Sequence, residues 1–300
     1  MISWLLVIIL AYFLFSLVSL GDKLILDGKP NAVVYTFYVG FFTIFLFLII
    51  PFINFGFPSS GTFLWIILEA VVYLLGLYLM YTAVEKFDVS KVITTIGATQ
   101  PIFVFALTWI FWGSQMMKTT NIIAFIFLVL GSIIISVGKN IKLTREYLKI
   151  TTLSSLMFSL DYVFSKFVFL DQPFLQGFLW TRIFIFLFSL LLLLSAKNRK
   201  QIFQKKVISN KKTNLFFAFT QMTGGGANIL QYFAIFLAPV AFLPIINSLR
   251  GIQYVFLFIM TLFMSFFLPK ILKEETSKKA VIQKIISIIL IAIGLALLVL

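Results

Sequence analysis

Residues 2–20 have the sequence ISWLLVIILAYFLFSLVSL, an apolar run without a charged residue. A helix needs about 20 mostly apolar residues to cross the hydrocarbon core of a bilayer, so this run is long enough to span a membrane. Since no positively charged segment precedes it and further apolar runs follow, we interpret it as a first span and not as a cleaved signal peptide.

Similar runs recur along the whole chain, separated by short polar breaks. They predict ten transmembrane helices, at 2–20, 32–53, 63–84, 89–113, 120–138, 148–169, 174–195, 214–236, 240–268 and 281–300. Helices satisfy their own backbone polar groups, which lipid cannot do, so we expect an all-α membrane protein. No break is long enough for a soluble domain, which predicts a single membrane domain.

The composition supports a membrane protein and excludes several kinds of chemistry. Hydrophobic residues make up 61% of the chain and charged residues 11%, whereas soluble domains have roughly 45–50% and about 25%. There is no Cys and no His, which excludes disulfides, thiolate sites and His-based catalysis. An intramembrane enzyme would need a pair such as Asp-Asp, and Asp161 has no second Asp within a span. We therefore expect neither an enzyme nor a metal or cofactor site.

The basic residues predict an orientation in the cell (inner) membrane. Of 24 Lys and Arg, 20 fall in the breaks after odd-numbered spans, whereas Lys118 alone lies in the opposite set and three lie within spans. Because positive loops stay in the cytoplasm, residues 197–212 are expected inside and both termini outside. Short basic loops beside an anionic leaflet do not indicate a nucleic-acid partner.

The second half of the sequence repeats features of the first. Three blocks match. At an offset of 143, Phe15-Ser16-Leu17, Lys23 and Pro30 match Phe158-Ser159-Leu160, Lys166 and Pro173. At an offset of 151, Tyr81, Ala83, Val89, Val104 and Phe105 match Tyr232, Ala234, Val240, Val255 and Phe256, and at an offset of 163, Ile122-Ile123 and Gly131 match Ile285-Ile286 and Gly294. The blocks predict five-helix repeats at 1–140 and 147–300. An odd number of spans inverts one repeat relative to the other, a design that recurs in transporters with a midplane binding site.

The sequence resembles the drug/metabolite transporter superfamily, and within it the ten-helix proteins with EamA-type repeats. The residues that carry the resemblance are the first-span pattern ending at Pro30 or Pro173, Arg182 nine residues later, the block from Ala83 through Val89-Ser90 to Gln100-Pro101, and Gly131. It implies a membrane transporter over essentially the whole chain. Two features depart from the family: no acidic residue follows the fourth span directly, and the family's termini are usually cytoplasmic.

Polar residues within the spans indicate where a solute would bind. Gln221, Gly224, Asn228 and Gln231 recur every three or four residues, as do Asn247, Arg250 and Tyr254, so each set lies along one helix face. Buried ionisable residues are functional candidates by default, although amides also join helices and Arg250 has a structural alternative, pairing with Asp161 or Glu69. The predicted substrate-binding residues are Gln221, Asn228, Gln231, Asn247, Arg250, Tyr254, Asp161 and Tyr73.

The charges within the spans favour one class of solute. Glu69 and Asp161 nearly cancel Arg182 and Arg250, which suits a polar or zwitterionic metabolite such as an amino acid. We therefore expect a secondary transporter working by alternating access, with a lipid or isoprenoid-phosphate flippase as the alternative. Protons are the candidate coupling ion, with Asp161 as carrier. Membrane lipid surrounds the chain, and spans 120–138 and 281–300 offer a contact for a homodimer.

Overall fold

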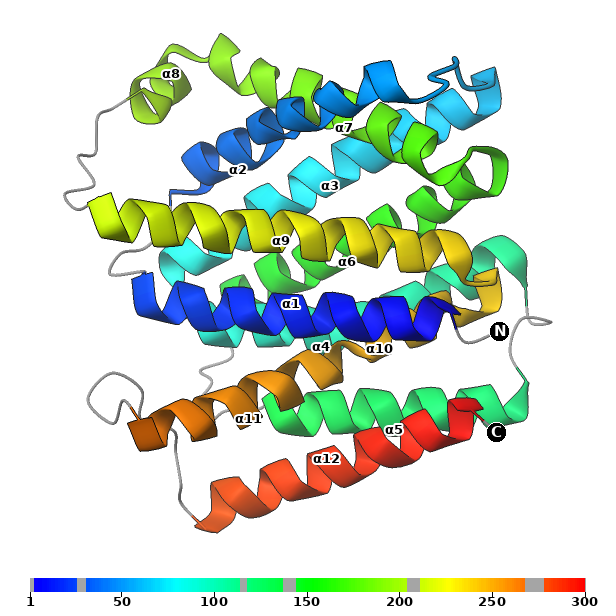
Figure 1. The fold of residues 1–300 in the computed structure, drawn as a ribbon, viewed down its shortest axis with the longest axis vertical. Coiled ribbons are helices and arrows are strands. Elements are labelled where there is room, and N and C mark those ends of the chain that lie inside the picture. The colour runs from blue at the N-terminus through cyan, green and yellow to red at the C-terminus, as the bar shows by residue number, and fades with distance from the viewer. Residues whose placement is uncertain are drawn as a thin grey trace. The chain divides into compact units, whose positions relative to one another are not determined.

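The structure, a computed structural model, describes residues 3–25, 31–113, 118–136, 144–203, 211–267 and 278–299. These residues are helical almost throughout and contain no strand (Figure 1). The predicted all-α class is therefore confirmed. Pro30 and residues 204–210 of the basic stretch 197–212 lie outside the described residues.

The elements follow the apolar runs closely. In chain order they are α1 (Ser3–Ile25), α2 (Ala32–Phe41), η1 (Phe42–Phe52), α3 (Ser60–Lys86), α4 (Val89–Trp112), α5 (Thr119–Ser136), α6 (Arg145–Asp171), α7 (Phe174–Leu191), η3 (Leu192–Leu194), α8 (Ala196–Ile202), α9 (Lys211–Leu237), η4 (Val240–Phe242), α10 (Leu243–Ser248), α11 (Arg250–Phe267) and α12 (Lys278–Val299). Within the described ranges, seven helical stretches are long and apolar enough to cross a membrane, and α5 and α12 contain shorter apolar helices. The total of ten spans stays a prediction.

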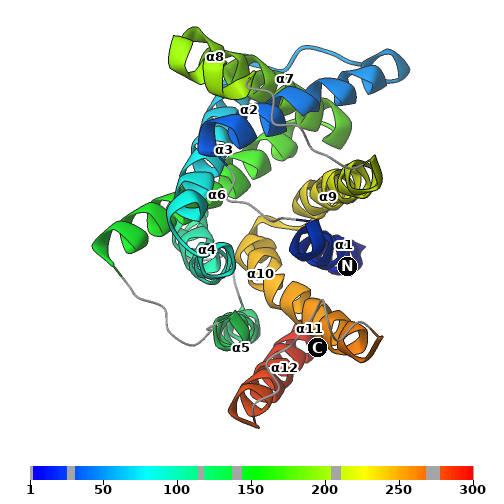
Figure 2. The ribbon, with the colours of Figure 1, turned by 90° about the vertical axis from the view of Figure 1, so that its left-hand side faces the viewer.

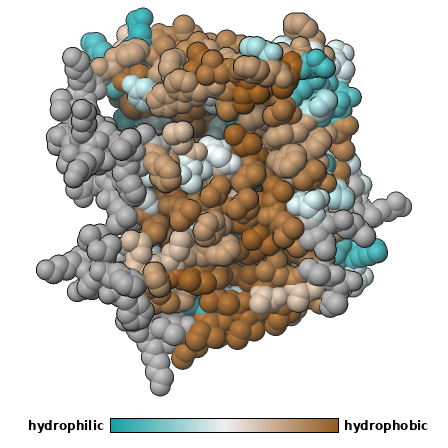
Figure 3. Space-filling view, viewed as in Figure 1, coloured by the Kyte–Doolittle hydropathy of each residue, from teal (hydrophilic) through white to brown (hydrophobic). Residues whose placement is uncertain are grey.

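Large apolar side chains cover much of the surface. Phe45, Leu48 and Leu194 are exposed to 64%, 71% and 79%, and the face in Figure 3 is apolar over most of its area. A soluble monomer rarely exposes contiguous apolar patches of this kind. Together with the long apolar helices, this surface suits a lipid environment.

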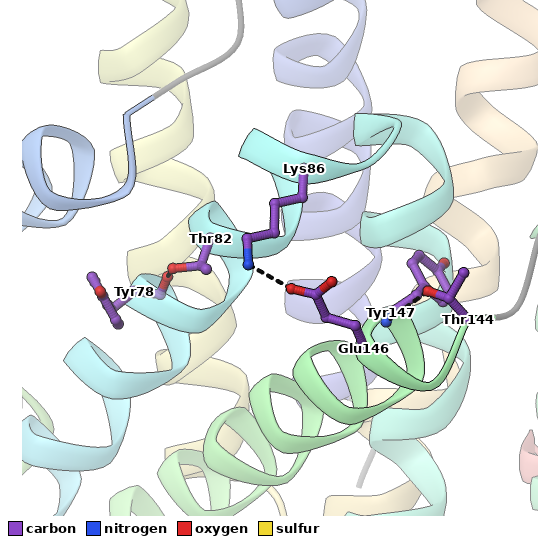
Figure 4. Close-up of polar contacts among 6 residues, drawn as sticks. All are labelled: Tyr78, Thr82, Lys86, Thr144, Glu146 and Tyr147. Atoms are coloured by element: carbon purple, nitrogen blue, oxygen red, sulfur yellow. Dashed lines mark hydrogen bonds and ion pairs between the residues drawn. The ribbon is translucent and has the colours of Figure 1, made fainter.

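Two helices extend beyond the apolar runs that predicted them. The runs 63–84 and 148–169 correspond to α3 (Ser60–Lys86) and α6 (Arg145–Asp171). Both helices begin earlier than the runs because polar residues cap them. Ser59 accepts a hydrogen bond from the Thr62 amide at 3.3 Å, and Thr144 accepts one from the Tyr147 amide at 3.1 Å. Figure 4 shows the second cap beside the ion pair of Lys86 and Glu146, 2.5 Å long.

The basic stretch 197–212, expected to be a loop, begins instead with the short helix α8. Its last residue, Ile202, is 3% exposed. The carbonyl oxygen of Ile202 accepts a hydrogen bond from the Tyr38 hydroxyl at 3.2 Å. Ile202, a buried apolar residue within a basic run, thus anchors the short helix α8, which the pattern of charges did not predict.

The expected single helix 240–268 is divided at Leu249, between α10 and α11. The break frees backbone carbonyls that an unbroken helix would use internally. Tyr12 donates its hydroxyl to the Ile246 oxygen at 2.8 Å, and Ser132 donates to the Ser248 oxygen at 2.9 Å. Irregular backbone within a membrane needs such replacement partners.

The helices gather into two compact units. The first contains Met1–Asp27, Thr108–Lys139 and Ile208–Leu300, and the second contains Gly28–Leu107 and Asn140–Val207. Each unit draws helices from both halves of the sequence. The units are therefore a different division of the chain from the predicted repeats 1–140 and 147–300, which stay a prediction.

In the first unit, α1 packs along α9 and α5 packs along α12 (Figures 1 and 2). The second contact is close and antiparallel. A Cβ atom on Gly131 would stand 2.7 Å from Ile291, and one on Gly294 would stand 2.7 Å from Leu128. Each glycine thus admits the other helix to a distance that no larger residue would allow.

In the second unit, α3 packs along α6, and hydrogen bonds join α4 to α6. Serine hydroxyls tie these helices together through backbone oxygens. Ser154 donates to the Gly76 oxygen at 3.0 Å, and Ser159 donates to the Gln100 oxygen at 3.2 Å. These bonds tie α6 to α3 and to α4, and α6 carries Asp161, one of the charged residues described next.

Candidate functional site

Three charged residues are buried together in the second unit. Glu69 on α3, Asp161 on α6 and Arg182 on α7 are 1%, 3% and 2% exposed. The charges of Asp161 and Arg182 both act on Glu69, which also lies beside the hydroxyls of Ser165 and Thr181. We call these five residues the charged cluster.

Aromatic rings hold the arginine of the charged cluster in place. The Arg182 guanidinium lies 5.1 Å from the centre of the Tyr73 ring and 4.6 Å from that of Phe178. Both distances are within the range of cation–π attraction, which is strongest where water is excluded. The rings therefore fix the guanidinium beside the carboxylates.

The charged cluster lies deep along its helices. Tyr73 is the central residue of α3, so Glu69 is displaced from the middle of that helix by four residues, or about 6 Å. Asp161 is three residues from the middle of α6, or about 4.5 Å. Neither side chain is long enough to reach the end of its helix, so both carboxyl groups are satisfied by protein or by a bound species.

A second set of buried polar groups lies in the first unit. Gln231 on α9 is 4% exposed, and Asn247 on α10 is fully buried. Among the described residues, Gln231 Nε2, both polar atoms of the Asn247 amide and the Tyr254 hydroxyl have no hydrogen-bond partner. We call Gln231, Asn247 and Tyr254 the amide site.

The turn between α9 and α10 brings the two amides to one level. Gln231 and Asn247 each lie eight residues from Pro239, or about 12 Å at the helical rise. Asn228 and Arg250 each lie eleven residues from it, at a second common level. Near this turn α9 contacts α10, and α1 packs against both α9 and α11.

The remaining predicted site residues are less enclosed. Gln221 is exposed, and Asn228 and Arg250 are half-buried. The run Gly224-Gly225-Gly226 in α9 has loose surroundings: a Cβ atom on Gly224 would stand 3.6 Å from Val18, and atoms on the next two glycines meet nothing within 4 Å in the described parts of the chain. The polar face of α9 thus passes from exposed at Gln221 to buried at Gln231.

Asp161 and Tyr73 were predicted to face the same cavity as the amides. They lie in the second unit, the other predicted residues lie in the first, and their meeting in one cavity stays a prediction. Within the second unit, the arginine beside Glu69 and Asp161 is Arg182. The sequence did not identify this grouping, because it depends on which residues of α3 face α6.

Among the described residues, no three His, Cys, Asp or Glu side chains gather in the way a protein metal centre requires. The two sites therefore offer amides, hydroxyls, one buried guanidinium and a pair of carboxylates. Such groups bind by hydrogen bonding and charge. They suit recognition of a polar solute or a small cation.

Comparison with known proteins shows the fold alone. No protein-family model matches the sequence, and no curated protein matches it. A solved structure described as "Crystal structure of protein" superposes with a TM-score of 0.69 over 98% of this chain and 96% of that chain, at 14% identity. A likeness at this identity shows that the two chains share a helical fold with the same order of helices.

Proposed function

We propose that this protein is a secondary transporter that moves a small polar or zwitterionic metabolite, amino-acid-like in chemistry, across the cell membrane by alternating access. The amide site carries the proposal. Asn247 is fully buried with both polar atoms unpartnered, next to the break between α10 and α11. Leaving buried polar groups unsatisfied costs about 1–3 kcal/mol each, which a bound solute offsets. Discontinuous helices line the substrate sites of many transporters.

The packing of the third helix of each half supports an inverted repeat. At the offset of 151, Tyr73 on α3 corresponds to Gly224 on α9. At the offset of 143, Asp161 on α6 corresponds to Val18 on α1. Asp161 is close enough for its charge to act on Tyr73, and Gly224 lies against Val18. In each case, the third helix of one half packs in the same register on the first helix of the other.

The contact of α5 with α12 supports the same symmetry. At the offset of 163, Ala124 and Leu128 correspond to Ser287 and Ile291. Gly131 packs against Ser287 and Ile291, and Gly294 packs against Ala124 and Leu128. This reciprocal, antiparallel contact is what a twofold axis between inverted halves produces. Exchange of conformations between such halves gives alternating access.

Transport by purified protein in liposomes tests the proposal. We expect saturable uptake or exchange of at least one member of an amino-acid panel. Asn247→Ala should reduce it at least tenfold, because the substitution removes both orphaned polar atoms. Asn198→Ala is the matched control, an amide in the short helix α8, and should leave transport unchanged.

Two outcomes contradict this proposal. Movement of an isoprenoid phosphate or phospholipid without movement of any water-soluble solute would favour the flippase alternative. Equal transport by the wild type and a well-folded Asn247→Ala variant would exclude the amide site from the solute path.

A further inference from the structure

The charged cluster has an unbalanced charge. Glu69 and Asp161 are two carboxylates, and Arg182 is one cation, so their sum is one negative charge. Within α2, α3 and α4, which pack around them, the remaining charged residues lie at helix ends: Glu85, Lys86 and Lys91. Lys91 pairs with Asp88 at 3.8 Å, and along α4 it is about 16 Å from the level of Asp161.

A second buried cation, on α6, faces a different direction from Asp161. Lys166 is 3% exposed and lies five residues after Asp161. Five residues rotate a side chain by about 140° around a helix. Tyr73, on α3, is the one further titratable group close to Glu69 and Arg182 in the described cluster, and its hydroxyl is ordinarily neutral.

The two hydroxyls beside Glu69 also have backbone partners. Ser165 donates to the Asp161 backbone oxygen at 2.6 Å, and Thr181 donates to the Phe178 backbone oxygen at 2.8 Å. Each hydroxyl has one proton, for which its backbone oxygen and the Glu69 carboxyl compete. Glu69 Oε2 is buried and finds no hydrogen-bond partner within the described residues. A buried carboxyl oxygen without a hydrogen-bond partner, in a cluster whose charges sum to one negative charge, is the environment of a bound cation.

We propose that Glu69 and Asp161, with the hydroxyls of Ser165 and Thr181, form a binding site for a single monovalent cation, supplied as a proton or as Na⁺. The cation neutralises the one charge that Arg182 leaves unbalanced. As a proton it joins Glu69 Oε2 to a neighbouring oxygen, and as Na⁺ it is coordinated by the same oxygens. The inference rests on the proposed transport function for its role, since this cation is then the coupling ion.

Thermal unfolding of the purified full-length protein in detergent tests the site without any transported solute. A ligand that binds the folded state raises the Tm in proportion to the logarithm of its concentration. In the first arm, choline chloride replaces Na⁺, and pH rises from about 5 to about 9. If a proton occupies the site, the Tm of the wild type falls relative to that of Glu69→Gln as pH rises, because only the wild type loses a stabilising proton.

The second arm titrates NaCl against choline chloride at the upper pH. If Na⁺ is the occupant, the Tm of the wild type rises with Na⁺, and Glu69→Gln loses this rise. Asp161→Asn should lose the same response, because either substitution removes the unbalanced charge. Glu69→Asp should retain it in part. Glu146→Gln, a carboxylate in the exposed pair with Lys86, is the matched control and should respond as the wild type does.

The proposal is overturned if the wild type, Glu69→Gln and Asp161→Asn give parallel Tm curves in both arms. If Glu69→Gln does not fold, Asp161→Asn carries the same comparison. The result is separable from the transport proposal. A cation response without solute transport leaves the site standing, and solute transport without a cation response leaves the transporter standing.

Discussion

The helix pairs α3–α6 and α9–α1 pack in the same register, but charged side chains lie at the first contact and uncharged ones at the second. Between α3 and α6, the facing residues include Glu69, Tyr73 and Asp161. Between α9 and α1, the residues at the corresponding positions are Thr220, Gly224 and Val18, which are uncharged and small. Gly21 on α1 packs against Thr220, and Gly224 packs against Val18.

Comparing the two helix pairs distinguishes side chains that the packing needs from side chains that serve a site. Uncharged side chains suffice for this helix pairing, since α1 and α9 pair without any described charge at these positions. A charge buried in a membrane helix costs about 3 kcal/mol on insertion scales. The charges between α3 and α6 therefore require a reason other than packing, and a bound cation supplies one.

The largest expected effect is that of Arg182→Gln. It leaves Glu69 and Asp161 facing one another without the guanidinium, and breaking a buried pair in this way destabilises by about 3–5 kcal/mol. Chemical or thermal unfolding of the detergent-solubilised protein measures the loss. Adding Glu69→Gln to Arg182→Gln should recover much of the stability. A mild effect of Arg182→Gln alone would mean that its charge does not balance the carboxylates.

Much of the fold was predictable from the sequence, because apolar runs of bilayer length determine where helices form. The positions of α3, α6 and α7 agree with the predicted runs to within a few residues, and caps such as Thr144 explain the differences. The break at Leu249 was not predictable, because the hydroxyls of Tyr12 and Ser132 that satisfy its carbonyls are distant in sequence.

The candidate sites were predictable in part. Helical spacing on α9 identified Gln231 before its burial was known, and the polar residues beside the break included Asn247. Glu69 and Arg182 were noted as buried charges but were not grouped with Asp161. Their proximity depends on the register of α3 on α6, which involves residues about ninety positions apart and leaves no local pattern in the sequence.

A smaller effect on stability is expected from alanine substitutions at one glycine of each helix pair. A Cβ atom on Gly76 of α3 would stand 3.1 Å from the Phe158 ring and 3.3 Å from Met157, whereas one on Gly224 of α9 has an ordinary contact at 3.6 Å with Val18. Gly76→Ala should therefore destabilise by about 1 kcal/mol through overpacking. Gly224→Ala should be neutral or stabilise by up to about 1 kcal/mol through helix propensity.

Parallel unfolding curves of the two alanine variants measure the difference. Equal destabilisation would show that Gly224 is as tightly packed as Gly76, and the open surface assigned to the three glycines of α9 would then be wrong.

The smallest effect is expected at the exposed ends of α3 and α6, where an ion pair joins the two helices. The Lys86 and Glu146 side chains retain 49% and 58% of their exposure, and their charged atoms are 2.5 Å apart. Exposed pairs contribute about 0–1 kcal/mol, because water and salt screen the attraction. Lys86→Ala should therefore lower stability by about 0.5 kcal/mol or less, and about 1 M choline chloride should abolish the difference. Arg182→Gln should keep its full effect in that salt, since water does not reach the charged cluster. If salt reduced the two effects equally, the charged cluster would be solvated, and its charges would need neither Arg182 nor a cation.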